Sequence, residues 1–176
     1  MQRRSQRLRG WPINFAHRGG AKVVPENTVE GFREGFTLGG GHRSGIELAV
    51  FGQIEAAGAL KRTLVVSDSR GTISRFRKVS QGKVATASST VELLRYWILH
   101  VLHLGGVYDP PFQALQPPEK YKGVVPVVTR RFVRNAQDRG LRVDVWTIDD
   151  EPAMRRLLSY GVDGIMTDRP DVLVAC

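Results

Sequence analysis

The sequence predicts an α/β protein built around a parallel β-sheet, and three observations support this fold class. Short apolar segments typical of strands alternate along the chain with longer segments whose apolar residues recur at helical spacing. Glycines such as Gly140 and Gly161 follow predicted helices, and a strand candidate comes soon after each. The 176 residues, 41% of them hydrophobic, suffice for one domain with a core. Strands joined in this way by helices lie parallel.

The first third of the chain shows this alternation from its start. We expect a strand at Ile13 to His17 and a helix at Asn27 to Leu38, whose first turn Asn27 can cap. An apolar run at Gly45 to Val50 predicts the next strand, and Gly52 to Leu60 predicts a short helix.

The middle third begins with Thr63 to Ser67, an apolar segment that predicts a buried strand. A helix is expected at Ile73 to Val79 and a strand at Val84 to Ala87. Thr90 to Leu104 predicts a helix whose apolar residues run nearly all round it, so we expect this helix to be largely buried. Phe112 to Leu115 predicts another strand.

The last third carries the clearest signals for the start and end of helices. Asp150 can cap a helix that has a proline in its first turn, and Gly161 can end it. The expected elements are a loop at Pro117 to Gly123, a helix at Arg130 to Arg139, a strand at Leu141 to Ile148, the helix that follows Asp150, and a final strand at Gly164 to Thr167.

Composition and charge narrow the class of protein. The net charge is +9, but the basic residues are spread along the chain and cluster only at Arg3 to Arg9, so no nucleic-acid partner is expected. The single cysteine, Cys176, cannot form an internal disulfide, and the longest apolar stretch is too polar to span a bilayer. These features predict a cytoplasmic location. We expect a basic tail at residues 1–10 and one folded domain at residues 11–176.

A first candidate site is the sequence His17-Arg18-Gly19-Gly20, which follows the first predicted strand. In parallel α/β folds, ligands bind at the carboxyl ends of strands. A histidine there can act as general acid or base, and an arginine can clamp a phosphate. Glycines let backbone amides approach an anion. Taken alone, the tripeptide fits an ordinary loop histidine better than a catalytic one.

Four further motifs follow along the chain. Pro25-Glu26-Asn27-Thr28 suits a helix start, and Glu47 lies in an apolar segment, where its carboxylate needs a cation, a metal ion or an open strand end. Val145 to Asp149 and Gly161 to Pro170 each contain a strand with acidic residues after it. Each motif is also compatible with plain scaffold, and Trp146 with a place in the core.

The order of these five motifs resembles that of the glycerophosphodiester phosphodiesterase family. The resemblance covers Phe15 to Leu38 and Leu64 to Leu173. It implies a TIM-like βα-barrel and an enzyme that hydrolyses glycerophosphodiesters to glycerol 3-phosphate and an alcohol. It also implies a divalent cation, Ca²⁺ or Mg²⁺, as cofactor.

The resemblance also implies roles for individual residues. His17 corresponds to one of two acid/base histidines, and Arg18 to the arginine that binds phosphate. Gly19 and Trp146 are expected to contact the substrate, Glu26 and Asn27 to support the loop, and Glu47 to hold the metal ion.

An internal part of the family pattern is missing from this chain. Between Val50 and Leu64 there is no Thr-x-Asp-Gly turn, no His-Asp strand end and no Glu-Ile-Lys strand. Glu47 is therefore the one surviving metal carboxylate of three, and the second histidine is absent. A complete barrel takes about 250 residues, so we expect an incomplete barrel of about seven strands that has lost about two βα units. Its open edges leave three alternatives: closure with fewer strands, pairing with a second copy, or an unstable fold.

The missing histidine leaves several functional hypotheses open. His42 precedes the Glu47 segment and can substitute as acid or base, whereas His100 and His103 are interpreted as ordinary residues of a long helix. The alternatives are an impaired phosphodiesterase, a non-catalytic descendant that binds phosphate esters, and a truncated gene product that folds poorly.

Overall fold

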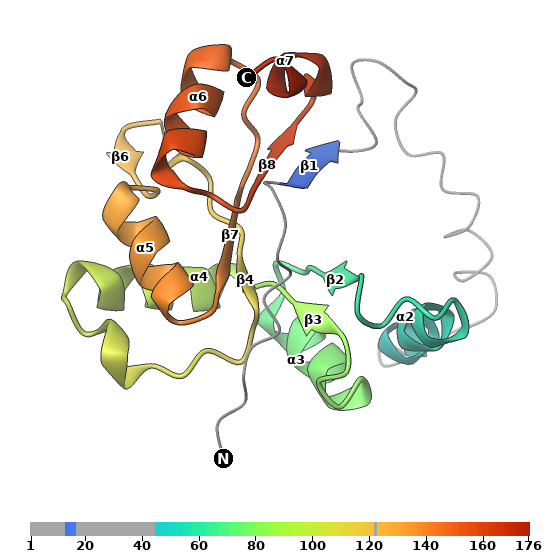
Figure 1. The fold of residues 1–176 in the computed structure, drawn as a ribbon. Helices are drawn as coiled ribbons and strands as arrows, with labels where there is room; N and C mark the ends of the chain where they lie inside the picture. The colour runs from blue at the N-terminus through green and yellow to red at the C-terminus, as the bar shows by residue number, and fades with distance from the viewer. Residues whose placement is uncertain (1–12, 17–44, 122) are drawn as a thin grey trace.

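The computed structural model describes residues 13–16, 45–121 and 123–176. Strands and helices alternate along these residues, as the sequence predicts, and Figure 1 shows their arrangement. A four-stranded parallel sheet has the order β1-β8-β7-β4, and a second parallel pair joins β2 to β3. The bounds are β1 Ile13–Ala16, β2 Leu64–Val65, β3 Ala85–Thr86, β4 Ala114–Leu115, β7 Arg142–Val145 and β8 Gly164–Thr167.

The two parallel sheets continue into each other. Ala87 and Ala114 form a parallel bridge, and the Ser88 amide donates to the Ala114 carbonyl at 2.9 Å. The strands therefore follow one another in the order β1-β8-β7-β4-β3-β2, with β1 and β2 at the two open edges. In the described residues neither edge strand has a partner on its outer side, so the wall of the barrel does not close. The stretch from which the sequence predicts that units are missing, between Val50 and Leu64, lies in the part of the chain that joins these two edges.

The helices of the last third match the prediction closely. α5 Arg130–Asp138 begins where the Thr129 side chain accepts from the Phe132 amide, and α6 Glu151–Tyr160 begins where Asp150 accepts from the Ala153 amide. Gly161 ends α6 with φ of 82°, a left-handed conformation that favours glycine. Both helices lie beside β7 and β8 in Figure 1.

The hydrophobic core lies between these helices and the sheet. Its fully buried side chains come from strands, from α5 and from α6, and include Leu115, Phe132, Val133, Val143, Met154, Leu157 and Ile165. The chain ends in α7 Pro170–Val174. Among the described residues, no helix is long and apolar enough to cross a membrane.

Two predictions about the first two thirds are wrong. Gly45 to Val50 is not a strand, because it forms one helix with the residues after it, α2 Gly45–Ala56. Glutamate, leucine and alanine are strong helix formers, and a short apolar run does not distinguish a buried strand from a helix. Thr63 to Ser67 forms only the two-residue β2, and its side chains are partly buried, because β2 lies at an open edge of the sheet.

A third correction concerns the segment predicted as a loop, Pro117 to Gly123. It contributes β5 Lys120–Tyr121, which pairs antiparallel with β6 Val125–Pro126. Gly123 has φ of 74°, and the Val124 amide donates to the Tyr121 carbonyl at 3.2 Å. The left-handed glycine makes the tight reversal that the hairpin needs.

The helices α3 Arg70–Val79 and α4 Thr90–Val101 follow β2 and β3, and the 3-10 helix η2 Gly105–Val107 comes after α4. The prediction that the segment from Thr90 to Leu104 is largely buried is wrong. Its outward face exposes aliphatic side chains to solvent, because no described element covers that side of α4: Val91, Leu94, Ile98, Val101, Leu102 and Leu104 are all exposed.

Candidate functional site

The carboxyl ends of the parallel strands form the candidate site. β1 ends at Ala16, which pairs with Thr167 at the end of β8, so the two strands finish side by side. The His17-Arg18 motif follows this end of β1 in the sequence. The motif itself lies outside the described residues, so its roles stay predictions. The same holds for the predicted site residues Gly19, Glu26, Asn27 and His42.

Asp149 connects the loops that follow β7 and β8. Its Oδ1 accepts from the Thr167 hydroxyl at 3.1 Å and from the Asp168 amide at 2.8 Å. Thr167 is fully buried, and its hydroxyl also accepts from the Arg169 amide at 2.8 Å. These bonds fix the two loops that lie next to the end of β1.

Trp146 follows β7 directly and lies on the rim of the sheet rather than in the core. Its side chain is 42% exposed, and its indole Nε1 donates to the Gln116 carbonyl at 2.6 Å. The Trp146 amide donates to the Pro117 carbonyl, so the residue is held between the loops after β4 and β7. A half-exposed ring fixed at the strand ends can form one wall of a substrate site.

Ser88 is a rim residue that sequence reasoning missed. It follows β3 and is 8% exposed, and its hydroxyl has no hydrogen-bond partner among the described residues. A buried hydroxyl normally has a partner, because leaving it without one costs free energy. The only sequence signal is a pair of serines after a predicted strand.

Beneath the rim, a buried ion pair holds α3, β3 and α4 together. Arg77 donates to both carboxylate oxygens of Glu92, at 2.6 and 3.1 Å, and to the Thr86 hydroxyl at 2.9 Å. Burial alone raises the pKa of Glu92, but the bonds from Arg77 and Ser89 outweigh it, and the pKa of Glu92 is lowered. The pair fixes the position of β3, and with it the serines at its end.

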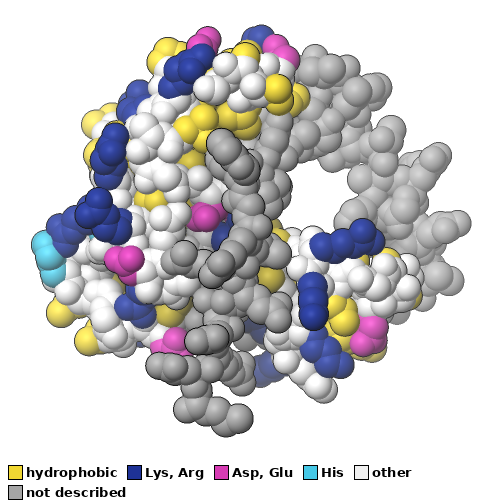
Figure 2. Space-filling model, in the orientation of Figure 1, with side chains coloured by type: hydrophobic (Ala, Val, Ile, Leu, Met, Phe, Trp, Pro, Cys, Tyr) yellow, Lys and Arg dark blue, Asp and Glu magenta, His cyan; other side chains and the backbone are white. Residues whose placement is uncertain are grey.

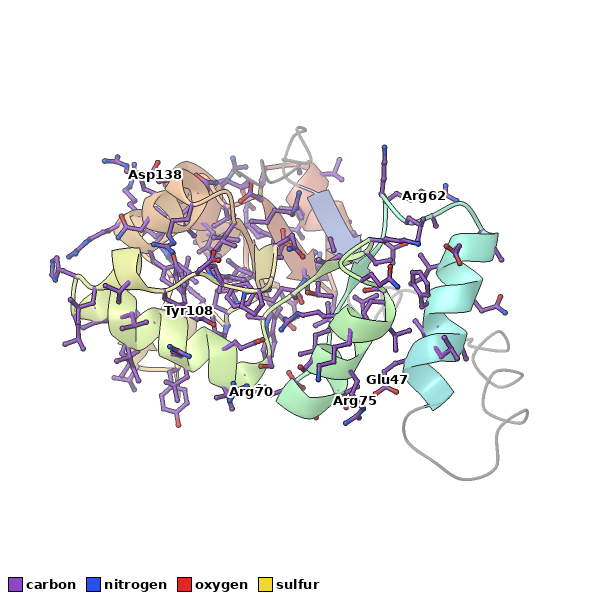
Figure 3. The ribbon with its side chains drawn as sticks, turned by 90° about the horizontal axis from the view of Figure 1, so that it is seen from below. Glu47, Arg62, Arg70, Arg75, Tyr108 and Asp138 are labelled. Carbon is purple, nitrogen blue, oxygen red and sulfur yellow. The ribbon has the colours of Figure 1, made fainter. Side chains whose placement is uncertain are left out.

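Glu47 lies on α2 and not on a strand, so its predicted place in an apolar strand is wrong. Its side chain is 3% exposed, and its Oε1 accepts from Arg75 Nε of α3 at 2.8 Å. Figure 3 shows Glu47 and Arg75 facing each other between the two helices. The cation that the sequence requires for this carboxylate is therefore an arginine, while the other oxygen, Oε2, has no partner among the described residues.

The described residues do not fit a Ca²⁺ or Mg²⁺ site. They contain no group of three or more His, Cys, Asp or Glu side chains that could hold a metal ion. These hard cations take about six or more oxygen ligands, and Glu47 already binds Arg75 through one of its two oxygens.

His100 and His103 lie away from the rim, near the end of α4, from where the chain returns to the amino end of β4. His100 is 8% exposed, packs edge-on against Phe132, and has its Nδ1 at 3.1 Å from Asn135 Nδ2. Burial lowers the pKa of His100, and the charges of Arg131 and His103 lower it further. His103 lies beyond the end of α4 with φ of 62°, so it is not a helix residue as predicted.

Comparison with known proteins assigns this fold to a family. The model of the Glycerophosphoryl diester phosphodiesterase family matches residues 59–172. The chain belongs to this family. The match begins just before β2 and includes all but the last residue of the longer stretch on which the resemblance rests, Leu64 to Leu173.

Relatives of known name agree with this assignment. The chain is 34% identical over 125 residues to Probable glycerophosphodiester phosphodiesterase 2 of Mycobacterium tuberculosis. The aligned residues make up 68% of this chain and 46% of that protein. It is also 33% identical over 54 residues to a glycerophosphodiester phosphodiesterase of Caldanaerobacter subterraneus. Here the aligned residues make up 31% of this chain and 21% of that protein. The chain therefore spans about half or less of these relatives.

Two solved structures share the fold. One, from Silicibacter pomeroyi, is assigned as a glycerophosphoryl diester phosphodiesterase and has a TM-score of 0.55 at 23% identity, covering 76% of this chain and 45% of that one. A glycerophosphodiester phosphodiesterase from Parabacteroides distasonis has a TM-score of 0.54 at 20% identity, covering 76% and 50%. The predicted fold class, a TIM-like βα-barrel that is incomplete, is confirmed, with six parallel strands among the described residues.

Proposed function

We propose that the carboxyl ends of these strands carry a phosphodiesterase site that hydrolyses glycerophosphodiesters to glycerol 3-phosphate and an alcohol, at a rate reduced by the missing part of the barrel. The observation that carries the proposal is the parallel register of β1 with β8 in a chain of this family. This register places the end of β1, which His17-Arg18 follows in the sequence, beside the end of β8. Asp149 bonds the loop after β8 to the loop after β7.

The proposed chemistry divides the work among few residues. Arg18 suits the single negative charge of a phosphodiester, because a guanidinium binds two phosphate oxygens at once. His17 either removes a proton from the attacking hydroxyl or water, or gives one to the leaving alcohol. With one histidine at hand, water or His42 must make the other proton transfer, and for this reason we expect slow turnover.

We also propose that this activity requires Ca²⁺ or Mg²⁺. Among the described residues no group of three or more His, Cys, Asp or Glu side chains could hold either ion, so we expect the ligands of such an ion outside the described part of the chain. Loss of turnover in EDTA would assign the requirement to residues outside the described part.

Release of glycerol 3-phosphate from glycerophosphocholine and glycerophosphoethanolamine tests the function. We expect turnover that His17→Ala abolishes and that the matched histidine variant His103→Asn leaves unchanged, because His103 lies at the other end of the sheet. A folded protein with no release in Ca²⁺ or Mg²⁺ would contradict the proposal.

A non-catalytic protein that binds phosphate esters is the second candidate. It is favoured by the lack of a metal-binding cluster among the described residues and by the pairing of Glu47 with Arg75. Under this function, calorimetry shows binding of glycerol 3-phosphate that Arg18→Gln removes, while no substrate is hydrolysed. Absence of binding would eliminate it.

A further inference from the structure

α4 carries apolar side chains on both sides, because Leu93, Trp97 and Leu99 pack against the core while a second set faces solvent. The buried residues of its inward face are Glu92, Tyr96 and His100, which are 7%, 2% and 8% exposed. Its outward face carries aliphatic side chains at helical spacing, with Leu94 55% and Ile98 44% exposed. A surface helix normally keeps polar residues on its outward face, so the exposed aliphatic face of α4 is suited to a partner.

The apolar surface extends beyond α4 into η2, where Val107 is 77% exposed. A groove of about 330 Å³ runs along it. Arg95 lies in this groove with its guanidinium 4.5 Å from the centre of the Tyr108 ring, so the one charge among the lining side chains is positive. The groove is lined by Val91, Leu94, Arg95, Ile98, Leu99 and Val107.

A second hollow, of about 260 Å³, lies between α4, η2 and α5 and is rich in cations. Arg131 makes no salt bridge within the described part of the chain. The Arg139 guanidinium bonds to the carbonyls of Gly105 and Tyr108 and to no described carboxylate, and its Nε has no partner there. His100 and His103 also line the hollow, and Asp138 is its one acidic residue.

The groove and the hollow adjoin each other. Val107 lines the groove, and Gly105 and Gly106, of the same 3-10 turn, line the hollow. Figure 2 shows a histidine next to Lys or Arg side chains, with hydrophobic side chains below them, along the left edge of the molecule. An aliphatic surface therefore borders a pocket in which the arginines Arg131 and Arg139 outnumber the one carboxylate, Asp138.

Charge decides between the candidate occupants. In a symmetric pair of chains the same patch lies on both sides of the interface, so both sides would bring Arg95 and the excess positive charge of the hollow into it. An anionic phospholipid surface complements both features, because acyl chains accept the aliphatic stripe and phosphate accepts the cations. Interfacial helices combine these two properties.

We propose that the outward face of α4, with the hollow beside it, docks on a membrane that contains anionic phospholipid. Leu94, Ile98 and Val107 enter the interface between headgroups and acyl chains. The hollow with Arg131 receives a lipid phosphate.

Co-sedimentation with vesicles tests this docking in the full chain. We expect binding to phosphatidylcholine vesicles that contain phosphatidylglycerol, and much weaker binding to phosphatidylcholine alone. The double variant Leu94→Ser with Ile98→Ser should bind at least about tenfold more weakly, because it removes two aliphatic anchors. Arg131→Gln should bind about fivefold more weakly, the usual contribution of one charge near an anionic surface.

Matched controls separate the face from general charge and hydrophobicity. Arg134→Gln removes an exposed arginine from the same helix, α5, that does not line the hollow. Val174→Ser removes a valine that is 81% exposed on α7. Both should bind vesicles like the parent chain. All substitutions are at exposed positions, and unchanged thermal melting verifies that each variant is folded.

Three results would overturn the proposal. One is equal binding of the double variant and the parent chain. Another is binding of inorganic phosphate in the hollow, measured by calorimetry and lost in Arg131→Gln, in a chain that does not bind vesicles. The third is a doubled mass by light scattering that returns to the monomer value in the double variant, again without vesicle binding, which would identify a second copy as the occupant.

Discussion

Replacing Glu92 by glutamine should strongly destabilise the fold. The carboxylate accepts four hydrogen bonds: two from Arg77 at 2.6 and 3.1 Å, and two from the amide and hydroxyl of Ser89 at 2.8 and 2.9 Å. The side chains of Arg77 and Glu92 are only 14% and 9% exposed. Breaking a buried pair leaves one charge without compensation and costs about 3–5 kcal/mol. Because both side chains retain slight exposure, we expect a loss of about 3 kcal/mol.

Urea unfolding followed by circular dichroism measures this loss, with the dependence on urea concentration unchanged. The matched control is Glu151→Gln, which removes the same group from an exposed pair with Arg155, 51% and 52% exposed. Exposed pairs contribute little, so we expect a change below about 0.5 kcal/mol. If Glu92→Gln were as stable as Glu151→Gln, the role of the buried pair in joining α3, β3 and α4 would be refuted.

Acid should remove the stability that the ion pair of Glu92 with Arg77 contributes. The pKa of Glu92 is lowered in the folded state, so its ionised form stabilises the fold above the ordinary value of 4.5. This stability is lost as the pH falls through the folded-state pKa. The parent chain should therefore lose more stability in acid than Glu92→Gln, and equal losses would contradict the assignment.

Three further predictions concern other parts of the molecule. Burial lowers the pKa of His100 from its ordinary value of 6.5, so the unfolded state takes up the proton first as the pH falls. The melting temperature of the parent chain should therefore fall between about pH 7 and about pH 5.5, and that of His100→Gln should fall by less. Gly161→Ala should lower the free energy of unfolding in urea by about 1 kcal/mol, because φ is 82° even though there is open space for an added Cβ. An unchanged free energy would contradict the role of this glycine in ending α6. If the proposed function holds, Trp146→Ala should raise KM for glycerophosphocholine about threefold and Trp146→Phe should not, because the exposed aromatic face is what contacts the head group; equal KM values would exclude that contact.

The sequence predicts best where the signals are local. The cap at Asp150 and the left-handed Gly161 lie within a few residues of the helix that they bound, and α6 starts and ends as predicted. The resemblance locates Trp146 and Asp149 in the same way, since Trp146 directly follows β7 and Asp149 comes three residues later.

The sequence predicts less well where the partner of a residue is distant. Glu47 requires a cation, but nothing local identifies Arg75, which lies 28 residues away on another helix. The aliphatic residues around α4 indicate burial, yet burial depends on whether another element covers that side, and no described element does. Ser88 illustrates the same limit, because a serine after a strand does not show whether its hydroxyl has a partner.

Release of glycerol 3-phosphate by the purified chain tests the central claim most directly. We expect slow, measurable hydrolysis of glycerophosphocholine that His17→Ala abolishes and His103→Asn preserves. A well-folded chain that releases no glycerol 3-phosphate in Ca²⁺ or Mg²⁺, or that is equally active after His17→Ala, would contradict it.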